Sequence, residues 1–289
     1  MNVLVYGSTS GQGGAIVRRL AADGHSILAF SRHSGGSLAE AHQDIETVQG
    51  DLTDPASLAT AHEGVDLVIL TLPLVFDLQR FRANARAAID AAMSAGIERM
   101  IYNTSVFAGD EPLGDPLLDL IGEVAREIEV TFDAAIVRPP LLLANLQTPW
   151  TLPGIMENGE LRYPIAADLP VRWISHRNLA AFVSAIINAR SRGVFDVSDP
   201  DTLTGDQLAE TIAQATRRLL QYRAIEAEEF AAAAAPYVGK GGARHIAELY
   251  TTLERQSPSL FARPYDEAAR HLKPTLVSTK DALASDFSS

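Results

Sequence analysis

Cysteine is absent from this 289-residue chain, and lysine is nearly so. The absence of cysteine excludes disulfides, thiolate catalysis and Cys-ligated metal sites. The only lysines are Lys240, Lys273 and Lys280, so residues 1–239 contain none. No apolar run approaches the roughly 20 residues that a membrane-spanning helix needs. The net charge of −12 argues against nucleic acid, whose phosphates favour clustered Lys and Arg.

Other absences narrow the expected partners. The first predicted strand begins at residue 2 and leaves no room for a secretion signal, so we expect a cytoplasmic protein without a membrane partner. The seven histidines show no metal-ligand spacing, which predicts no metal site. A small-molecule substrate remains the expected partner, and a homodimer is possible.

Short apolar runs alternate with helical periodicity as far as residue 140, a pattern typical of a parallel sheet with crossover helices. We therefore predict an α/β fold, a Rossmann-type doubly wound parallel sheet over residues 1–145. Proline and aromatic residues become more frequent in residues 146–289. The predicted strands are 2–6, 26–31, 45–49, 65–71, 98–103, 134–138 and 195–198, and the predicted helices are 13–23, 55–63, 77–95, 116–131, 177–190, 204–218 and 243–255.

A glycine-rich turn links the first strand to the first helix. Its sequence is Gly7-Ser8-Thr9-Ser10-Gly11-Gln12-Gly13-Gly14. Helix N-termini carry unpaired N–H groups and favour anions, and glycines let the main chain approach a pyrophosphate. The strict G-x-G-x-x-G pattern is absent, because position 16 is isoleucine. A purely structural turn is the alternative, but the position after an N-terminal strand favours a phosphate cradle.

The turn resembles the G-x-T-G-x-x-G segment of atypical short-chain dehydrogenase/reductases, most closely those of the NmrA-like branch. That branch includes NADPH-dependent quinone and dye reductases and NADP-sensing regulators without turnover. Ser10 stands where the family usually has its second glycine, and Gly11 beside it would restore the lost freedom. The resemblance covers nearly the whole chain and weakens toward the C-terminus. It implies that residues 146–289 form a smaller mixed α/β lobe packed on the first part.

The end of the second strand indicates which nicotinamide cofactor fits. NAD-specific sites place an acid there, but the chain continues Ser31-Arg32-His33-Ser34 and has no acid before Glu40. A guanidinium can grip a 2′-phosphate bidentately and stack on adenine, so Arg32 favours NADPH. Ser31, His33 and Ser34 would add donors. A solvated surface arginine is the alternative.

Later segments match the family's cofactor cleft. In that resemblance Asp51 accepts from the adenine amino group and Leu52 packs on the ring, although Asp51 can equally begin a turn. Thr71-Leu72-Pro73 would line the path to the nicotinamide, and Pro139 would contribute near its end. The implied cofactor-binding residues are Gly7, Ser8, Thr9, Ser10, Gly11, Gln12, Gly13, Ser31, Arg32, Asp51, Leu52, Thr71, Leu72, Pro73, Thr104 and Pro139.

The chemistry cannot use the Tyr–Lys dyad of standard short-chain dehydrogenases. The stretch 116–123, where the dyad would lie, contains neither residue. Ser105 matches the family's catalytic serine and could polarise a substrate carbonyl, or simply form a turn hydrogen bond. His176 is a candidate general acid, since histidine titrates near neutral pH, or else a residue that caps the following helix.

Aromatic and apolar residues suggest a flat substrate wall. Trp150, Tyr163 and Trp173 would form the flat aromatic part, with core packing as the alternative for at least one of the three. The candidate substrate-binding residues are Val106, Phe107, Trp150 and Trp173. The favoured function is an NADPH-dependent oxidoreductase that transfers hydride to a quinone-like or conjugated carbonyl compound. A non-catalytic NADP(H)-binding redox sensor is the second hypothesis. An isomerase or epimerase is disfavoured, because those reactions need a strong positioned acid or base.

Overall fold

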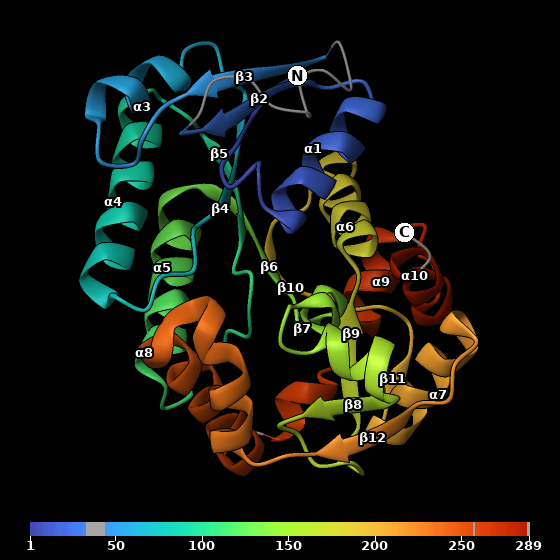
Figure 1. Cartoon of the computed structure of the whole chain (residues 1–289). Coiled ribbons are helices and arrows are strands. Elements are labelled where there is room, and N and C mark those ends of the chain that lie inside the picture. Colours follow the sequence, from blue (N-terminus) through green and yellow to red (C-terminus); the bar gives the residue numbers. More distant parts are fainter. Residues whose placement is uncertain (33–43, 257, 288–289) are drawn as a thin grey trace.

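The computed structural model describes residues 1–32, 44–256 and 258–287. A seven-stranded parallel sheet, in the order β10-β6-β5-β4-β1-β2-β3, forms its centre (Figure 1). The chain runs outward from β1 to β3 and then crosses to β4 and the other edge, which is the doubly wound arrangement. The predicted Rossmann-type fold is therefore confirmed. The strands are β1 (Asn2–Val5), β2 (Ser26–Ser31), β3 (Ile45–Gln49), β4 (Leu67–Thr71), β5 (Arg99–Asn103), β6 (Asp133–Arg138) and β10 (Gly193–Asp196).

Helices cover both faces of this sheet, and the alternation of side chains along each strand explains why. Val3 and Val5 of β1 pack under one helix layer, whereas Leu4 and Tyr6 pack under the other. The first layer consists of α1 (Gly11–Ala22) and α6 (His176–Asn188), and the second of α3 (Pro55–Ala61), α4 (Leu78–Ser94) and α5 (Pro116–Thr131) (Figure 1).

The second half of the chain adds two small sheets and further helices. The sheets have the orders β11-β9-β7 and β12-β8. The long helix α8 contains the predicted helix 243–255 and the five alanines 231–235, and it breaks at Gly239, whose φ is +76°. The remaining elements are β7 (Leu141–Leu142), β8 (Glu160–Tyr163), β9 (Val171–Ile174), β11 (Thr202–Leu203), β12 (Gln221–Ala224), α7 (Gly205–Thr216), α8 (Ala227–Gln256), α9 (Asp266–Leu272), α10 (Thr279–Asp286), two 3₁₀ segments (Leu143–Gln147 and Pro258–Ala262) and a π-helical turn (Gly154–Asn158).

The chain does not stay in the lobe after residue 146. It returns to the large sheet, where α6 packs on α1 and β10 pairs in parallel with β6. The reason is that β6 would otherwise be an exposed edge strand, and edge strands are normally covered or paired. The predicted division at residue 145 stays a prediction, but residues 176–196 lie with the first part.

A buried carboxylate holds this returning segment together. Asp199 accepts hydrogen bonds at Oδ1 from the Ser175 N–H (3.0 Å) and the Asn178 amide (2.7 Å). Asn178 in turn exchanges two hydrogen bonds with the backbone of Val277 and so fixes the C-terminal segment to α6. Burial raises the pKa of Asp199 to about 6, although the hydrogen bonds from Ser175 and Asn178 oppose the shift.

This raised pKa makes the free energy of unfolding depend on pH. The native state binds the Asp199 proton more tightly than the unfolded chain, so the contribution is present at low pH and is lost as pH rises through about 6. Between pH 4.5 and 7.5 it should fall by about 2 kcal/mol. Asp199→Asn keeps the Oδ1 acceptor but cannot ionise, so its free energy of unfolding should not show this fall with pH. Urea unfolding of both proteins at the two pH values checks this, and a stability difference that is independent of pH would contradict it.

Candidate functional site

One cavity of about 660 Å³ lies outside the carboxyl ends of β1 to β6, where open α/β sheets bind ligands. Each of these strands delivers a short segment to its wall, and α8 closes the cavity from the other side. The residues from the sequence prediction that line it are Gly7, Thr9, Ser10, Gln12, Ser31, Arg32, Asp51, Leu52, Thr71, Leu72, Pro73, Ser105, Val106, Phe107 and Trp150.

The glycine turn is a tight main-chain cradle. Gly7 has a φ of +68°, and a Cβ on Gly13 would lie 2.1 Å from the Gly7 carbonyl oxygen. The start of α1 thus lies so close to the end of β1 that no side chain fits at position 13. The helix N-terminus, with its unpaired N–H groups, faces the cavity. This cradle fits a pyrophosphate.

Ser10 does not stand in for a glycine that needs unusual backbone angles. Its φ is −78°, and its hydroxyl caps α1 by accepting from the Gly13 N–H at 3.0 Å. The freedom expected of Gly11 is not needed for this. Gly11 leaves space for the imidazole of His176, whose Cε1 would lie 2.3 Å from a Cβ there.

Several predicted residues support the cavity without lining it. The buried Ser8 hydroxyl donates to the Phe30 carbonyl at 2.8 Å, and Thr104 Oγ1 donates to the Val106 carbonyl at 2.7 Å. Pro139 is buried, and the neighbouring segment from Pro140 to Leu142 lines the wall instead. Gly11 and Gly13 act through the turn geometry.

His176 does not suit the role of general acid. It begins α6 and lies against Gly11 outside the cavity lining. Burial, and then the charge of Arg18, lower its pKa, so a smaller fraction of the imidazole carries a proton to donate at neutral pH. The interpretation as a residue at a helix start describes its position better, since the preceding Ser175 caps α6.

The end of the cavity near β2 and β3 carries two guanidinium groups. Arg32 and Arg80 both line it and both act on Asp51. The pKa of Asp51 is lowered mainly by the hydrogen bonds that its Oδ1 accepts from the Thr53 hydroxyl and N–H. Asp51 thus forms the predicted turn while also lining the cavity. The predicted donors His33 and Ser34 lie outside the described residues.

A buried amide organises the middle of the cavity. Asn103, fully buried at the end of β5, donates through Nδ2 to Gln12 Oε1 at 2.8 Å and accepts from the Ser105 N–H at 3.1 Å. Ser105 has a φ of +67°, a strained conformation for a residue with a side chain. The sequence analysis missed Asn103, because an Asn at a strand end gives no signal by itself.

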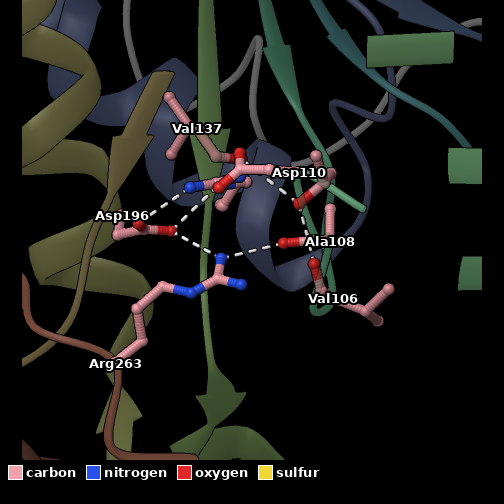
Figure 2. A network of polar contacts seen from close by, with 8 residues as sticks. Val106, Ala108, Asp110, Val137, Asp196 and Arg263 are labelled. Atoms are coloured by element: carbon pink, nitrogen blue, oxygen red, sulfur yellow. Dashed lines mark hydrogen bonds and ion pairs between the residues drawn. The ribbon is translucent and has the colours of Figure 1, made fainter. Parts of the chain in front are cut away.

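An ionic network fixes the wall segment that follows Ser105. Arg138, at the end of β6, makes a bidentate pair with Asp196 of β10 at 2.9 and 2.8 Å. Figure 2 shows Arg263 between Asp196 and the Ala108 carbonyl, with donor–acceptor distances of 2.7 and 2.8 Å. Arg138 also reaches Asp110 in the same segment. The position of Ser105, Val106 and Phe107 is therefore set from β10 and the C-terminal part of the chain.

The remaining part of the cavity is aromatic. Trp150 packs near Tyr237, with ring centroids 6.0 Å apart. Tyr163 and Tyr250 share a hydrogen bond between their hydroxyls at 2.8 Å, and burial raises the pKa of Tyr250 to about 12. Trp173, which was predicted to contact the substrate, is 3% exposed, packs in the core against Tyr163 and does not line the cavity.

The sequence analysis also missed a polar pair in this part of the cavity. His245 of α8 and Asp115, the N-cap of α5, both line it, with His245 Nε2 3.6 Å from Asp115 Oδ2. They are 130 positions apart, so only the tertiary fold brings them together. Leu117 and Leu118 line the cavity from the start of α5, within the stretch where a Tyr–Lys dyad would lie.

Comparison with known proteins agrees with this geometry. The model of the NmrA-like family matches residues 1–274. The chain belongs to the NmrA-like family. A NAD(P)H azoreductase of Xenophilus azovorans is 29% identical over 231 residues, which are 78% of each chain. The relatives of this chain therefore include an oxidoreductase.

Two solved structures share the fold. Triphenylmethane reductase of Citrobacter sp., complexed with NADP(H), superposes with a TM-score of 0.82 over 99% of both chains at 18% identity. NmrA, a negative transcriptional regulator, in complex with NADP, gives 0.77 over 99% of this chain and 95% of that one at 19% identity. In the part of this chain that the structure describes, none of the helices has both the length and the hydrophobicity that a membrane span needs.

The cradle makes a direct prediction for this NmrA-like protein. Gly13→Val should abolish NADPH binding, because its side chain would collide with the Gly7 carbonyl and displace the start of α1. Gly14→Ala is the matched control, since the nearest atom to its Cβ would be the Ser8 carbonyl oxygen at 3.3 Å. This variant should bind NADPH with an affinity within about three-fold of that of the unaltered protein. Calorimetric titration measures both, with circular dichroism to confirm folding. Normal NADPH binding by Gly13→Val would contradict the assignment.

Proposed function

We propose that this protein is an NADPH-dependent reductase that transfers hydride to a quinone-like or otherwise conjugated aromatic acceptor. One observation carries the proposal. A single cavity connects a main-chain phosphate cradle, through the polar end of β5, to a pocket lined by aromatic rings. A dinucleotide and a flat acceptor can therefore meet inside it. The azoreductase and dye reductase relatives support the same class of reaction.

The chain's own residues would position the reactants. The turn from Gly7 to Gly13 would hold the pyrophosphate, and Asn103 would fix the Gln12 side chain beside it. The bound nicotinamide would supply the hydride, which is the cofactor's chemistry rather than the protein's. Ser105, held in its strained conformation, would polarise an acceptor carbonyl. The aromatic pocket would exclude water.

NADPH rather than NADH is favoured by charge. Arg32 and Arg80 lie at the end of the cavity that follows β2 and β3, where the adenosine ribose of a bound dinucleotide would sit. Guanidinium groups bind phosphate bidentately, and a charged hydrogen bond contributes about 1.5–3 kcal/mol. NAD-specific sites have an acidic residue at the end of the second strand, but this chain has Ser31 and Arg32 there.

A non-catalytic NADP(H) sensor is the second candidate. The likeness to the transcriptional regulator NmrA extends over the fold and is compatible with it. The aromatic pocket that continues from the cradle favours the enzyme, because a sensor needs no space for a second small molecule. The expected homodimer and the cytoplasmic location stay predictions.

The absence of a Tyr–Lys dyad predicts which acceptors react. Quinones and conjugated dyes should consume NADPH, because their reduced forms are stabilised by delocalisation. Simple aliphatic ketones would form an alkoxide that no ring system delocalises, so without the Tyr–Lys dyad they should not react. Steady-state NADPH oxidation over a panel of both classes measures this. Full turnover of aliphatic ketones would contradict the mechanism, and tight NADPH binding with no turnover of any acceptor would favour the sensor.

The cofactor preference is tested at Arg32. The unaltered protein should bind NADPH at least ten-fold more tightly than NADH, about 1.4 kcal/mol. Arg32→Asp should narrow or reverse this ratio, because it replaces a phosphate partner with a like charge. Arg82→Asp makes the same change of charge on the outer, exposed side of α4 and should leave the ratio unchanged. Equal affinities of the unaltered protein for both nucleotides would refute the assignment.

A further inference from the structure

A buried imidazole nitrogen in the aromatic part of the cavity has no hydrogen-bond partner among the described residues. It is Nε2 of His245. Asp115 Oδ2 lies 3.6 Å away, just beyond hydrogen-bond distance. The Phe76 ring packs on the imidazole, with centroids 4.8 Å apart, and holds it in this orientation.

Asp115 is fixed just as firmly. Its Oδ1 accepts from the N–H groups of Leu117 and Leu118 at 2.9 and 3.0 Å and so caps α5. The positive end of the helix dipole stabilises the carboxylate there. Because Oδ1 is occupied, Oδ2 is the oxygen that faces His245. The two side chains leave one donor and one acceptor unused beside each other in the cavity wall.

A hydroxyl or carbonyl oxygen on an aromatic ring matches this pair. The oxygen can accept from Nε2–H, and a hydroxyl can at the same time donate to Oδ2. The same cavity wall contains apolar side chains, among them Leu118, Ile246 and Leu249, which would contact the ring itself. A buried polar group without a hydrogen bond costs free energy. A ligand that hydrogen-bonds to both side chains removes this cost and binds more tightly.

We propose that His245 and Asp115 bind an oxygen atom of the acceptor and that His245 donates a proton to this oxygen. The proposal rests on the proposed reductase function. A quinone becomes a hydroquinone by taking up one hydride, with its two electrons, and one proton. The bound nicotinamide would supply the hydride, which would bond to one quinone oxygen. The proton leaves Nε2 and the N–H electron pair stays on that nitrogen. A lone pair on the other quinone oxygen, the one that His245 and Asp115 bind, forms the new O–H bond. Solvent then returns a proton to Nε2, beside the Asp115 carboxylate.

Binding without any nucleotide tests the oxygen anchor. By equilibrium dialysis, the unaltered protein should bind 2-naphthol at least ten-fold more tightly than 2-methylnaphthalene. His245→Gln and Asp115→Asn should reduce this ratio to three-fold or less. Asparagine keeps the cap of α5, because its Oδ1 can still accept from both N–H groups. His25→Gln, a histidine outside the cavity lining, is the matched control and should keep the ratio. Equal binding of both ligands by the unaltered protein would overturn the anchor.

Turnover of two acceptors tests the proton. A naphthoquinone needs hydride and proton, whereas a cationic triarylmethane dye takes hydride alone on its central carbon. His245→Gln should slow single-turnover NADPH oxidation by the quinone at least ten-fold and leave the dye within two-fold. Added imidazole should restore quinone reduction in His245→Ala.

The outcomes separate the two proposals. Equal slowing with both acceptors, without rescue by imidazole, would mean that His245 acts only structurally and would overturn its role as proton donor. Unchanged quinone reduction in His245→Gln would do the same. If the unaltered protein oxidises NADPH with neither acceptor, the reductase function and the proton step both fail, while the naphthol preference still decides the anchor.

Discussion

The contact between Gly13 and the Gly7 carbonyl is the constraint on which the rest of the site depends. It places the N-terminus of α1 against the end of β1, and the alternating side chains of β1 then fix α1 on one face of the sheet. α6 packs beside α1, and its first residue, His176, touches Gly11. The returning part of the chain is therefore aligned on the same turn that forms the cradle. A side chain at Gly13 would disturb both.

The wall opposite the cradle depends on charge rather than on close backbone contact. Arg138, Asp196 and Arg263 connect β6, β10 and the C-terminal part of the chain, and through Ala108 they hold the segment that carries Ser105. Arg138 is nearly buried, so its pair with Asp196 is much less screened than a surface pair. The cavity thus has one wall set by packing and one set by ion pairs.

Local signals predicted the first half of the chain well. The period of apolar residues located each strand of β1 to β6 and the helices between them, and the glycine turn and Arg32 lie in the cavity wall as expected. What failed depends on tertiary contacts. Trp173 and His176 have the right chemistry for a site, but β9 turns the indole into the core and α6 turns the imidazole toward Gly11. Conversely, Asp115 and His245 carry no local signal for a site, since one precedes Pro116 and the other falls within the predicted helix 243–255. No short-range pattern shows that α8 brings them within 3.6 Å of each other.

The pairing of β10 with β6 has a consequence for dissecting the molecule. A fragment that stops at residue 145 would leave the last strand of its sheet without a neighbour and would remove Asp196 from Arg138. Such a fragment would expose a hydrophobic, hydrogen-bonding rim that invites self-association. Chimaeras that exchange the aromatic part of the cavity with another member of this family would therefore need to transplant two separate stretches of chain, before and after residues 176–196, rather than one C-terminal block.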